Sequence, residues 1–263
     1  MPDNISKQWV IILGGSRGLG LATAQKLAKH GYAICIVHRD RRADMETISQ
    51  NFQQIKADAG NFYSVNADAI NPERRKEVLI HLEELMGEGD TIKMLVHSIA
   101  KGSMKPILAD PEEGLTARDI EITFKSMALS LFEWVQEILN LKLNDADMRV
   151  ISFTSEGNTK VIQGYAAVSV AKVSLEALTR SMALELAPLG VKANCVQAGV
   201  TETDSFSMIP NSDGIKENAL KRNPSGRITT PEDVANTVYL LSLEEAKWIT
   251  GTVIKADGGE SLR

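Results

Sequence analysis

The stretch WVIILGGSRGLG, residues 9–20, joins a short apolar run to a glycine-rich loop. Residues 9–13 predict a buried strand, and an amphipathic helical pattern begins where the loop ends. Gly14, Gly18 and Gly20 therefore lie between a strand and a helix, where backbone N–H groups and the helix N-terminus approach a phosphate. This context favours a dinucleotide site over the alternative, a tight turn without a ligand.

Outward from this loop, strand and helix patterns alternate along the chain. The alternation predicts an α/β fold, a Rossmann-like doubly wound sheet of seven parallel strands with helices on both faces. No repeat or linker interrupts it, so we expect residues 1–263 to form one NAD(P)-binding domain. The expected strands are residues 9–13, 33–37, 61–66, 92–98, 149–154, 191–197 and 252–256, and the later helices 42–58, 72–86, 116–142, 164–187 and 231–242.

Residues 199–230 are the one segment too long for an ordinary connection. They carry several glycines and prolines and predict an irregular stretch. Long loops of this kind in compact proteins are usually binding segments or lids. Because Met208 and Ile209 are apolar, we expect an apolar, mobile substrate-binding flap here.

Composition excludes several classes of protein. The chain is 43% hydrophobic, enough for a large core, and its net charge of −5 argues against a nucleic-acid surface. No apolar run approaches the length of a membrane span, and the N-terminus MPDNISKQWV lacks the plan of a signal peptide. Cys35 and Cys195 fall in strand patterns, where we expect them reduced and buried, with no support for a metal site or a disulfide. We expect a soluble cytoplasmic protein.

The stretch YAAVSVAK, residues 165–172, opens the longest helical pattern. Tyr165 and Lys172 are seven positions apart, about two turns, so both side chains lie near one helix face. The ammonium favours the phenolate, with a weaker contribution from the helix N-terminus. Such a phenol can donate to an oxygen that gains negative charge during a reaction. The pair alone is weak evidence, because a tyrosine and a lysine at this spacing usually form a buried ring and a solvated amine tip.

The end of the second expected strand indicates which cofactor is bound. A carboxylate there binds the ribose 2′-hydroxyl of NAD, whereas arginine accommodates the extra phosphate of NADP. The chain has HRDRR at 38–42, and Arg17 and Arg39 are placed to hold a dianion from two sides. Asp40 complicates this interpretation, because it can pair with these arginines or bind a ribose. We expect NADP(H), with NAD(H) as the less favoured cofactor and a solvated basic turn as the alternative.

With these pieces placed, the chain resembles the short-chain dehydrogenase/reductases over its whole length. The motifs are GGSRGLG at 14–20, the region of Ser155, Tyr165 and Lys172, VKANCVQAG at 191–199 and ADGGESL at 256–262. The resemblance implies that Lys172 binds the nicotinamide ribose and that Tyr165 gives a proton or hydrogen bond to the substrate oxygen. It also implies a homotetramer.

The tyrosine position narrows the resemblance. Commoner members place the tyrosine four residues before the lysine, where this chain has Val168. A tyrosine seven residues before the lysine, and HSIA at 97–100, resemble NADPH-dependent enoyl-[acyl-carrier-protein] reductases of the Bacillus type. The resemblance implies reduction of the 2,3 double bond of enoyl thioesters in fatty-acid synthesis. The alternatives are a carbonyl reductase such as a 3-oxoacyl-[acyl-carrier-protein] reductase, or a non-catalytic NADP-binding sensor.

The distance between the carbon that takes the hydride and the oxygen that takes the charge favours enoyl reduction. Carbonyl reduction adds hydride to the carbon that bears the oxygen, whereas enoyl reduction adds it to the β-carbon while charge gathers on the thioester oxygen. The proton donor must then lie further from the hydride path. Moving the tyrosine by about one helical turn displaces its origin by about 5 Å, a distance of the right order.

The same resemblance implies a set of cofactor contacts. Asp68 and Ala69 line the adenine pocket, Thr203 lies at the diphosphate, and Gly199 and Val200 lie by the nicotinamide. The complete predicted set for the cofactor is Gly14, Ser16, Arg17, Gly18, Leu19, Gly20, Arg39, Asp68, Ala69, Ser98, Ile99, Ala100, Lys172, Gly199, Val200 and Thr203, and the predicted catalytic set is Tyr165, Lys172 and Ser155.

The chain departs from the family pattern at several positions. Leu13 replaces a usual threonine, and Lys125 stands where commoner members have an asparagine that relays protons. Ser155 takes the place of the usual catalytic serine, and it is either an accessory hydroxyl or a turn residue. We expect His97 to close a strand near the adenosine rather than to act as an acid.

The expected substrate is an acyl thioester carried on acyl carrier protein, which is acidic and needs a basic landing surface. The basic residues around the flap predict such a surface, with ordinary solvated charges as the alternative. They are Lys216, Lys221, Arg222 and Arg227.

Overall fold

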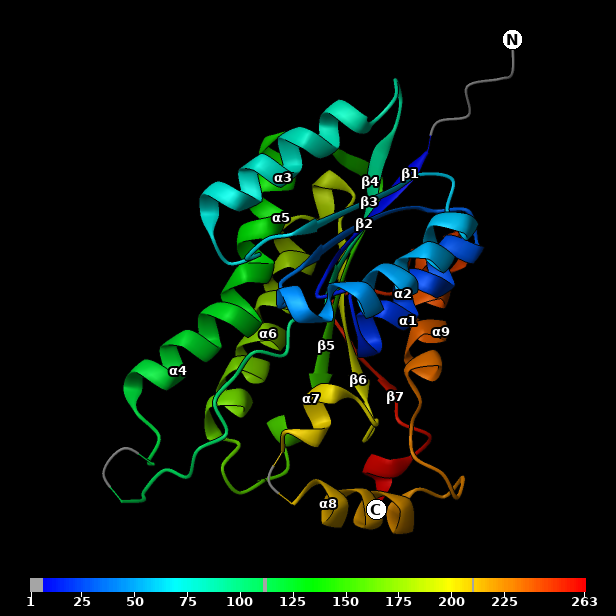
Figure 1. Ribbon diagram of the computed structural model, residues 1–263. Helices are drawn as coiled ribbons and strands as arrows, with labels where there is room; N and C mark the ends of the chain where they lie inside the picture. Colours follow the sequence, from blue (N-terminus) through cyan, green and yellow to red (C-terminus); the bar gives the residue numbers. More distant parts are fainter. Residues whose placement is uncertain (1–6, 111–112, 210) are drawn as a thin grey trace.

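The computed structural model describes residues 7–110, 113–209 and 211–263. Residues 1–6, on which the expectation about a leader sequence partly depends, lie outside this range. Seven parallel strands form one sheet in the order β3-β2-β1-β4-β5-β6-β7 (Figure 1), which confirms the predicted Rossmann-like α/β fold. The strands are β1 Gln8–Leu13, β2 Ala33–His38, β3 Phe62–Asn66, β4 Thr91–His97, β5 Asn144–Ser155, β6 Lys192–Ala198 and β7 Val253–Ala256.

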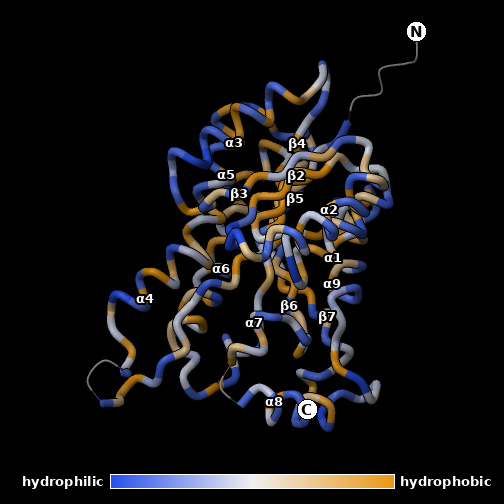
Figure 2. The backbone as a smooth tube through the Cα atoms, viewed as in Figure 1, coloured by the Kyte–Doolittle hydropathy of each residue, from blue (hydrophilic) through white to orange (hydrophobic). Residues whose placement is uncertain are grey.

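The central strands are buried on both faces because their sequences are nearly continuous apolar runs (Figure 2). Their side chains alternate between two cores. Trp9, Ile11 and Leu13 of β1 face one core, and Val10 and Ile12 face the other. Because all the strands pair in parallel, their carboxyl ends, and the loops that follow them, lie at the same edge of the sheet.

The two cores are closed by different helices (Figure 1). One face of the sheet carries helices from both ends of the chain, and the other carries helices from its middle. The first group comprises α1 Gly18–Lys29, α2 Met45–Asp58 and α9 Pro231–Ser242, and the second α3 Pro72–Leu85, α5 Ser130–Asn140 and α6 Ala166–Glu185. Gly31 follows α1 with a φ of 85°, the left-handed conformation expected of a residue that ends a helix.

The helix predicted over 116–142 is two helices joined by an irregular turn. It comprises α4 Ala117–Phe124, a π-helical turn Lys125–Leu129 and α5. Thr116 and Asp119 begin α4 with a reciprocal capping box. Lys125 is exposed on the π-helical turn, whereas Ser126 and Met127 are buried.

The segment 199–230 is more ordered than its sequence predicts. It contains α7 Asp204–Ser207 and α8 Ser212–Arg222, and its residue 210 lies outside the described part of the chain. Thr203 begins α7, because its hydroxyl accepts a hydrogen bond from the N–H of Phe206 at 3.2 Å. In Figure 1 the C-terminal segment lies beside α8.

β5 begins five residues earlier than predicted, in a charged segment. Asp147 near its start accepts hydrogen bonds or ion pairs from Lys93, Arg149 and Lys192, at 2.9, 2.7 and 2.8 Å. These contacts hold the pKa of Asp147 well below its usual value although burial opposes the shift. No helix in the described residues is long and apolar enough to cross a membrane.

Candidate active site

Three adjoining cavities lie beyond the carboxyl ends of the central strands. The sheet order reverses between β1 and β4, because the chain goes from β1 to β2 on one side and later to β4 on the other. The loops after these two strands diverge, which leaves a crevice where ligands bind in open α/β sheets.

The glycine loop forms one wall of a cavity of about 340 Å³. Gly14 has a φ of 83°, and a Cβ on it would lie 2.5 Å from the carbonyl oxygen of Ser98. A Cβ on Gly20 would lie 2.3 Å from the carbonyl oxygen of Gly14. Glycine is therefore required at both positions for β1, the loop and α1 to approach one another. Thr203 lies beside Gly18 on the opposite side of the loop.

A second cavity, of about 300 Å³, extends from this loop over the end of β2. It is lined by Arg39, Asp68, Ala69 and Ile99, as the sequence predicts for an adenosine site. Together the two cavities have the extent and the glycine-lined neck that a dinucleotide requires, so the residues present fit such a cofactor.

The predicted arginine clamp is not assembled as the sequence suggested. Arg39 donates to Asp68 at 2.9 Å, and Arg17 pairs with Asp204 at 2.8 Å, Asp44 at 3.1 Å and Asp40 at 3.5 Å. Each guanidinium is therefore directed to nearby carboxylates. The alternation of strands and helices does not reveal which carboxylates surround the end of a strand, so these pairs could not be predicted.

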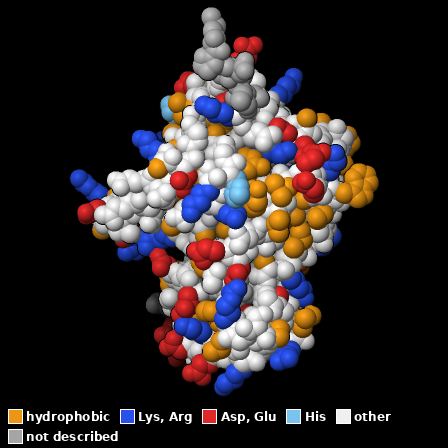
Figure 3. All heavy atoms as spheres, turned by 90° about the vertical axis from the view of Figure 1, so that its right-hand side faces the viewer, with side chains coloured by type: hydrophobic (Ala, Val, Ile, Leu, Met, Phe, Trp, Pro, Cys, Tyr) orange, Lys and Arg blue, Asp and Glu red, His pale blue; other side chains and the backbone are white. Residues whose placement is uncertain are grey.

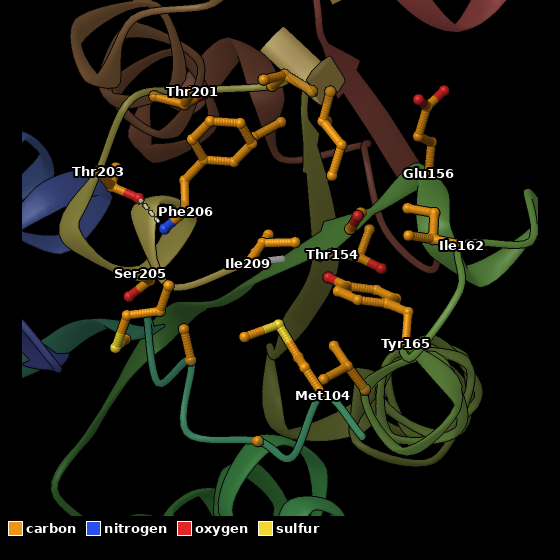
Figure 4. Close-up of a pocket in the computed structure, with 18 of the residues that line it drawn as sticks. Met104, Thr154, Glu156, Ile162, Tyr165, Thr201, Thr203, Ser205, Phe206 and Ile209 are labelled. Atoms are coloured by element: carbon orange, nitrogen blue, oxygen red, sulfur yellow. Dashed lines mark hydrogen bonds between the residues drawn. The ribbon is translucent and has the colours of Figure 1, made fainter. Parts of the chain in front are cut away.

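Tyr165 stands at the N-terminus of α6, and its hydroxyl points into the third cavity (Figure 4). A Cβ on Gly157 would lie 2.6 Å from Cε1 of the ring, so only glycine at 157 leaves room for this orientation. Burial raises the pKa of Tyr165, and the nearby hydroxyl of Ser155 partly opposes the shift. The phenol therefore stays protonated at neutral pH, which corrects the expectation that Lys172 favours the phenolate.

Lys172 is buried, and its Nζ donates to the carbonyl oxygen of Phe153 at 2.6 Å. Burial lowers its pKa to about 8, and the more distant charge of Glu176 only partly opposes this. The carboxylate of Glu176 instead accepts from Thr154 at 2.6 Å and from Asn158. Lys172 and Tyr165 line the same cavity, as their spacing predicted.

His97 lies against α5 rather than at the adenosine cavity. Its Nε2 is 2.8 Å from the hydroxyl of Ser130, which itself donates to the carbonyl oxygen of Ser126. Nε2 is therefore the donor. Burial, followed by the charge of Lys172, lowers the pKa of His97 to about 3, so the ring is uncharged at neutral pH and is not a general acid.

The third cavity, which we call the acyl chamber, has a volume of about 300 Å³ and mostly apolar walls. Met104 enters from the loop after β4, Ile162 from the loop before α6, and Phe206 and Ile209 from the segment around α7 (Figure 4). The sequence predicted an apolar flap here but not Ile162 or Thr154, because neither belongs to an amphipathic pattern that points to a ligand.

Most predicted site residues converge on these cavities. Ser16, Leu19, Ser98 and Ala100 line the cavity that holds the glycine loop, and Gly199 and Val200 line the acyl chamber. Ser155 lines both of these cavities. Gly20 lines none of the three cavities, and its lack of a side chain lets α1 pack against the glycine loop.

Comparison with known proteins gives the family. A family model described as Enoyl-(Acyl carrier protein) reductase matches residues 14–261. The chain is 31% identical to the 3-oxoacyl-[acyl-carrier-protein] reductase of Aquifex aeolicus over 95% of each chain. It is 27% identical to the 1-cyclohexenylcarbonyl-CoA reductase of Streptomyces collinus, over 97% of this chain and 88% of that one.

A solved structure supports the fold. The enoyl-[acyl-carrier-protein] reductase (NADH) of Aquifex aeolicus superposes with a TM-score of 0.83 at 22% identity, over 98% of each chain. The glycine loop, the Tyr165–Lys172 pair and the family match agree, and the chain belongs to the short-chain dehydrogenase/reductase superfamily of oxidoreductases.

Proposed function

We propose that this chain is an NADPH-dependent reductase of acyl thioesters, and that the double bond of an enoyl thioester is the group reduced. The position of Tyr165 carries the second part of the proposal. Its hydroxyl enters the acyl chamber one helical turn before Val168, and Val168 itself lies buried in the chamber wall. The relative from Streptomyces collinus supports this reaction, since its name describes a thioester with a ring double bond beside the carbonyl.

A 3-oxoacyl thioester is the second candidate substrate. Most of the named relatives are 3-oxoacyl-[acyl-carrier-protein] reductases, at 26–31% identity, and they favour this reaction over the enoyl reaction. Ser155 and Tyr165 also line the same two cavities, an arrangement that is consistent with a carbonyl-reducing pair. The relatives and the tyrosine position thus point to different reactions on the same fold, and a direct assay distinguishes them.

A bound nicotinamide cofactor would supply the hydride, which for an enoyl substrate adds to the β-carbon. Tyr165, protonated at neutral pH, donates a hydrogen bond to the thioester oxygen as negative charge gathers on it. Lys172, held by the carbonyl oxygen of Phe153, orients the ribose and adds positive potential. The apolar walls of the acyl chamber surround the developing enolate, and a proton that reaches the α-carbon from water or through Tyr165 completes the saturated thioester.

The preference for NADPH is proposed from Arg39. Its side chain is 54% exposed at the end of β2, beside the cavity that fits adenosine. Among the described residues, Asp68 supplies its one carboxylate contact, which leaves other guanidinium donors for a 2′-phosphate. Arg39→Ala is expected to raise KM for NADPH about tenfold and to leave KM for NADH nearly unchanged.

An oligomer is proposed from resemblance and from the surface. Figure 3 shows hydrophobic side chains gathered on the side of the molecule that carries α9. Leu240 of α9 and Trp248, which follows it, are 59% and 94% exposed. Light scattering of the purified protein tests whether it is the expected tetramer.

The decisive test follows NADPH oxidation on a 2-enoyl thioester and a 3-oxoacyl thioester in parallel. Turnover of the enoyl substrate alone supports the proposal, and turnover of the 3-oxo substrate alone shows that Tyr165 serves a carbonyl. Binding of NADPH without oxidation on either substrate would indicate a sensor.

A further inference from the structure

Arg222, the last residue of α8, joins segments that are far apart in the sequence. Its guanidinium donates to both oxygens of Glu156, at 2.5 and 3.1 Å, and to Glu260 at 2.9 Å. Glu156 follows Ser155 at the end of β5, and Glu260 begins the C-terminal 3₁₀ turn Glu260–Leu262. The sequence predicted Arg222 as part of a basic landing surface, but these contacts occupy it.

Other members of that predicted surface are also paired. Lys216 pairs with Glu202, and Arg227 forms two hydrogen bonds with Asp233, at 2.6 and 2.9 Å. Lys221 has no ion pair within the described residues. The predicted landing surface is therefore largely neutralised, and the charge of Arg222 serves an internal contact.

Glu260 carries the connection onward to the acyl chamber. It is only 1% exposed, and its second oxygen accepts a hydrogen bond from the N–H of Val200 at 3.0 Å. A Cβ on Gly199 would lie 2.8 Å from this oxygen, so the carboxylate packs against the loop after β6. Gly199 and Val200 line the acyl chamber.

The other two segments joined by Arg222 also form walls of the chamber. Glu156 lines it directly, and Ile215 of α8 lines both the chamber and a neighbouring open cavity that Arg222 borders. The guanidinium of Arg222 thus connects α8 with the turn after Ser155 and, through Glu260, with the loop of Val200.

The charges around this contact make Arg222 difficult to replace. Burial opposes ionisation of Glu156, but hydrogen bonds from Arg222 and Lys160 hold its pKa below the usual value. Burial raises the pKa of Glu260, and the N–H of Val200 and the charge of Arg222 only partly oppose this. Without Arg222, the half-buried Glu156 would keep only Lys160, and the buried Glu260 would lose its cation, which is unfavourable.

We propose that Arg222 is a positioning residue that holds α8 against the acyl chamber and so sets its affinity for the acyl thioester. The inference rests on the proposed function for the identity of the ligand and on the contacts of Arg222 for the mechanism. It assigns Arg222 no contact with the reacting atoms, so loss of the side chain should weaken substrate binding more than it slows the chemical step.

The test compares Arg222→Met with Arg222→Lys and with Arg227→Met, using whichever thioester the wild type reduces, without a carrier protein. Arg222→Met is expected to raise KM for the thioester at least tenfold, with a smaller change in kcat, and to speed proteolysis within residues 211–221. Arg222→Lys should restore part of the affinity, because an ammonium still reaches one carboxylate. Arg227→Met removes a comparable arginine–carboxylate pair that borders a separate cavity, and should leave KM unchanged.

A triple variant covers the case in which Arg222→Met does not fold. Glu156→Gln, Arg222→Met and Glu260→Gln together remove all three charges and leave no unpaired buried ion. This variant should fold and show the same high KM and rapid proteolysis. Wild-type KM and proteolysis in a folded variant that lacks Arg222 would overturn the proposal. If the wild type reduced neither thioester, the proposed function would fail, whereas the proteolysis rates would still test the role of Arg222.

Discussion

The two ends of β5 both contain buried cations, but only one end neutralises them. At the N-terminal end, Lys93 and Arg149 are buried and both contact the carboxylate of Asp147. At the C-terminal end, Lys172 is equally buried, and its nearest polar contact is the carbonyl oxygen of Phe153. Glu176, four residues later on the same helix, is held by Thr154 and Asn158 instead.

The two ends of β5 use buried cations for different purposes, stability at one end and chemistry at the other. The N-terminal cluster stabilises the sheet, because each buried cation has a carboxylate and the carboxylate has several donors. At the C-terminal end, burial lowers the pKa of the Lys172 ammonium to about 8, and no carboxylate among the described residues contacts it to oppose this shift. Strongly perturbed ionisation of this kind is concentrated at functional sites.

Tyr165→Phe should produce the largest change, at the C-terminal end. It removes the donor to the developing oxyanion, so we expect kcat to fall by about 10²- to 10⁴-fold with little change in thermal stability. Tyr239→Phe is the matched control, since that phenol stacks on His30 away from the cavities. A Tyr165→Phe enzyme with wild-type kcat would show that another residue serves the oxygen.

Asp147→Ala should lower the stability of the N-terminal end of β5. It leaves Lys93 and Arg149 buried without their shared carboxylate, so the free energy of unfolding should fall by about 3–5 kcal/mol. Because the pKa of Asp147 is depressed, its contribution is present at neutral pH and is lost as the pH falls through its folded value. Denaturant melts measure the change, and kcat of the folded fraction should not move. Asp58→Ala, on an exposed helix face, is the control and should be nearly neutral.

Lys172→Met should reveal the cost of the unpaired ammonium. Below pH 8 the wild type buries a charge that the variant lacks, so the variant should be at least as stable. From about pH 8 to 10.5 the unfolded wild type holds a proton that the folded chain has released, so wild-type stability should rise relative to the variant by up to roughly 3 kcal/mol.

The activity of the wild type should change in the opposite direction over the same range. kcat should decline as the pH rises through about 8, because the ammonium that supports the reaction is lost. A stability difference that stays constant between pH 8 and 10.5 would show that Lys172 keeps an ordinary pKa.

Ser155→Ala should give the smallest change and discriminate between the candidate substrates. If the substrate is an enoyl thioester, Ser155 only modulates Tyr165, and kcat should fall less than about tenfold. A fall of about 10²-fold or more would instead indicate that Ser155 holds a carbonyl oxygen during reduction. Steady-state kinetics on both thioesters measure this, with Ser174→Ala on the exposed face of α6 as control.

The amino-acid pattern predicted the sheet almost completely, because apolar runs and glycine positions are local features. It did not predict the start of β5 at Asn144, since that segment is polar and only half-buried, and Asp147 within it pairs with Lys93 and Lys192 from other strands. It also missed α8, because the helix contains Gly214 and has weak apolar periodicity, and tertiary contacts stabilise it.

The sequence predicted most of the residues that line the candidate site, but it did not predict the ion pairs around them. Spacing placed Tyr165 and Lys172 on one cavity, because helical periodicity is regular over two turns. The carboxylates around Arg17 and Arg222 come from positions distant in the sequence, and no local pattern reveals them. Ion pairs of this kind decide whether an arginine is available to a phosphate or a carrier protein.

The acyl chamber and the cavity of the glycine loop share a wall that includes Leu19, Ser155, Tyr165 and Thr203. A nucleotide seated in the second cavity would therefore complete one side of the first. We expect compulsory-order kinetics, in which the nucleotide enters first and leaves last. The oxidised nucleotide should then inhibit competitively against NADPH and noncompetitively against the thioester.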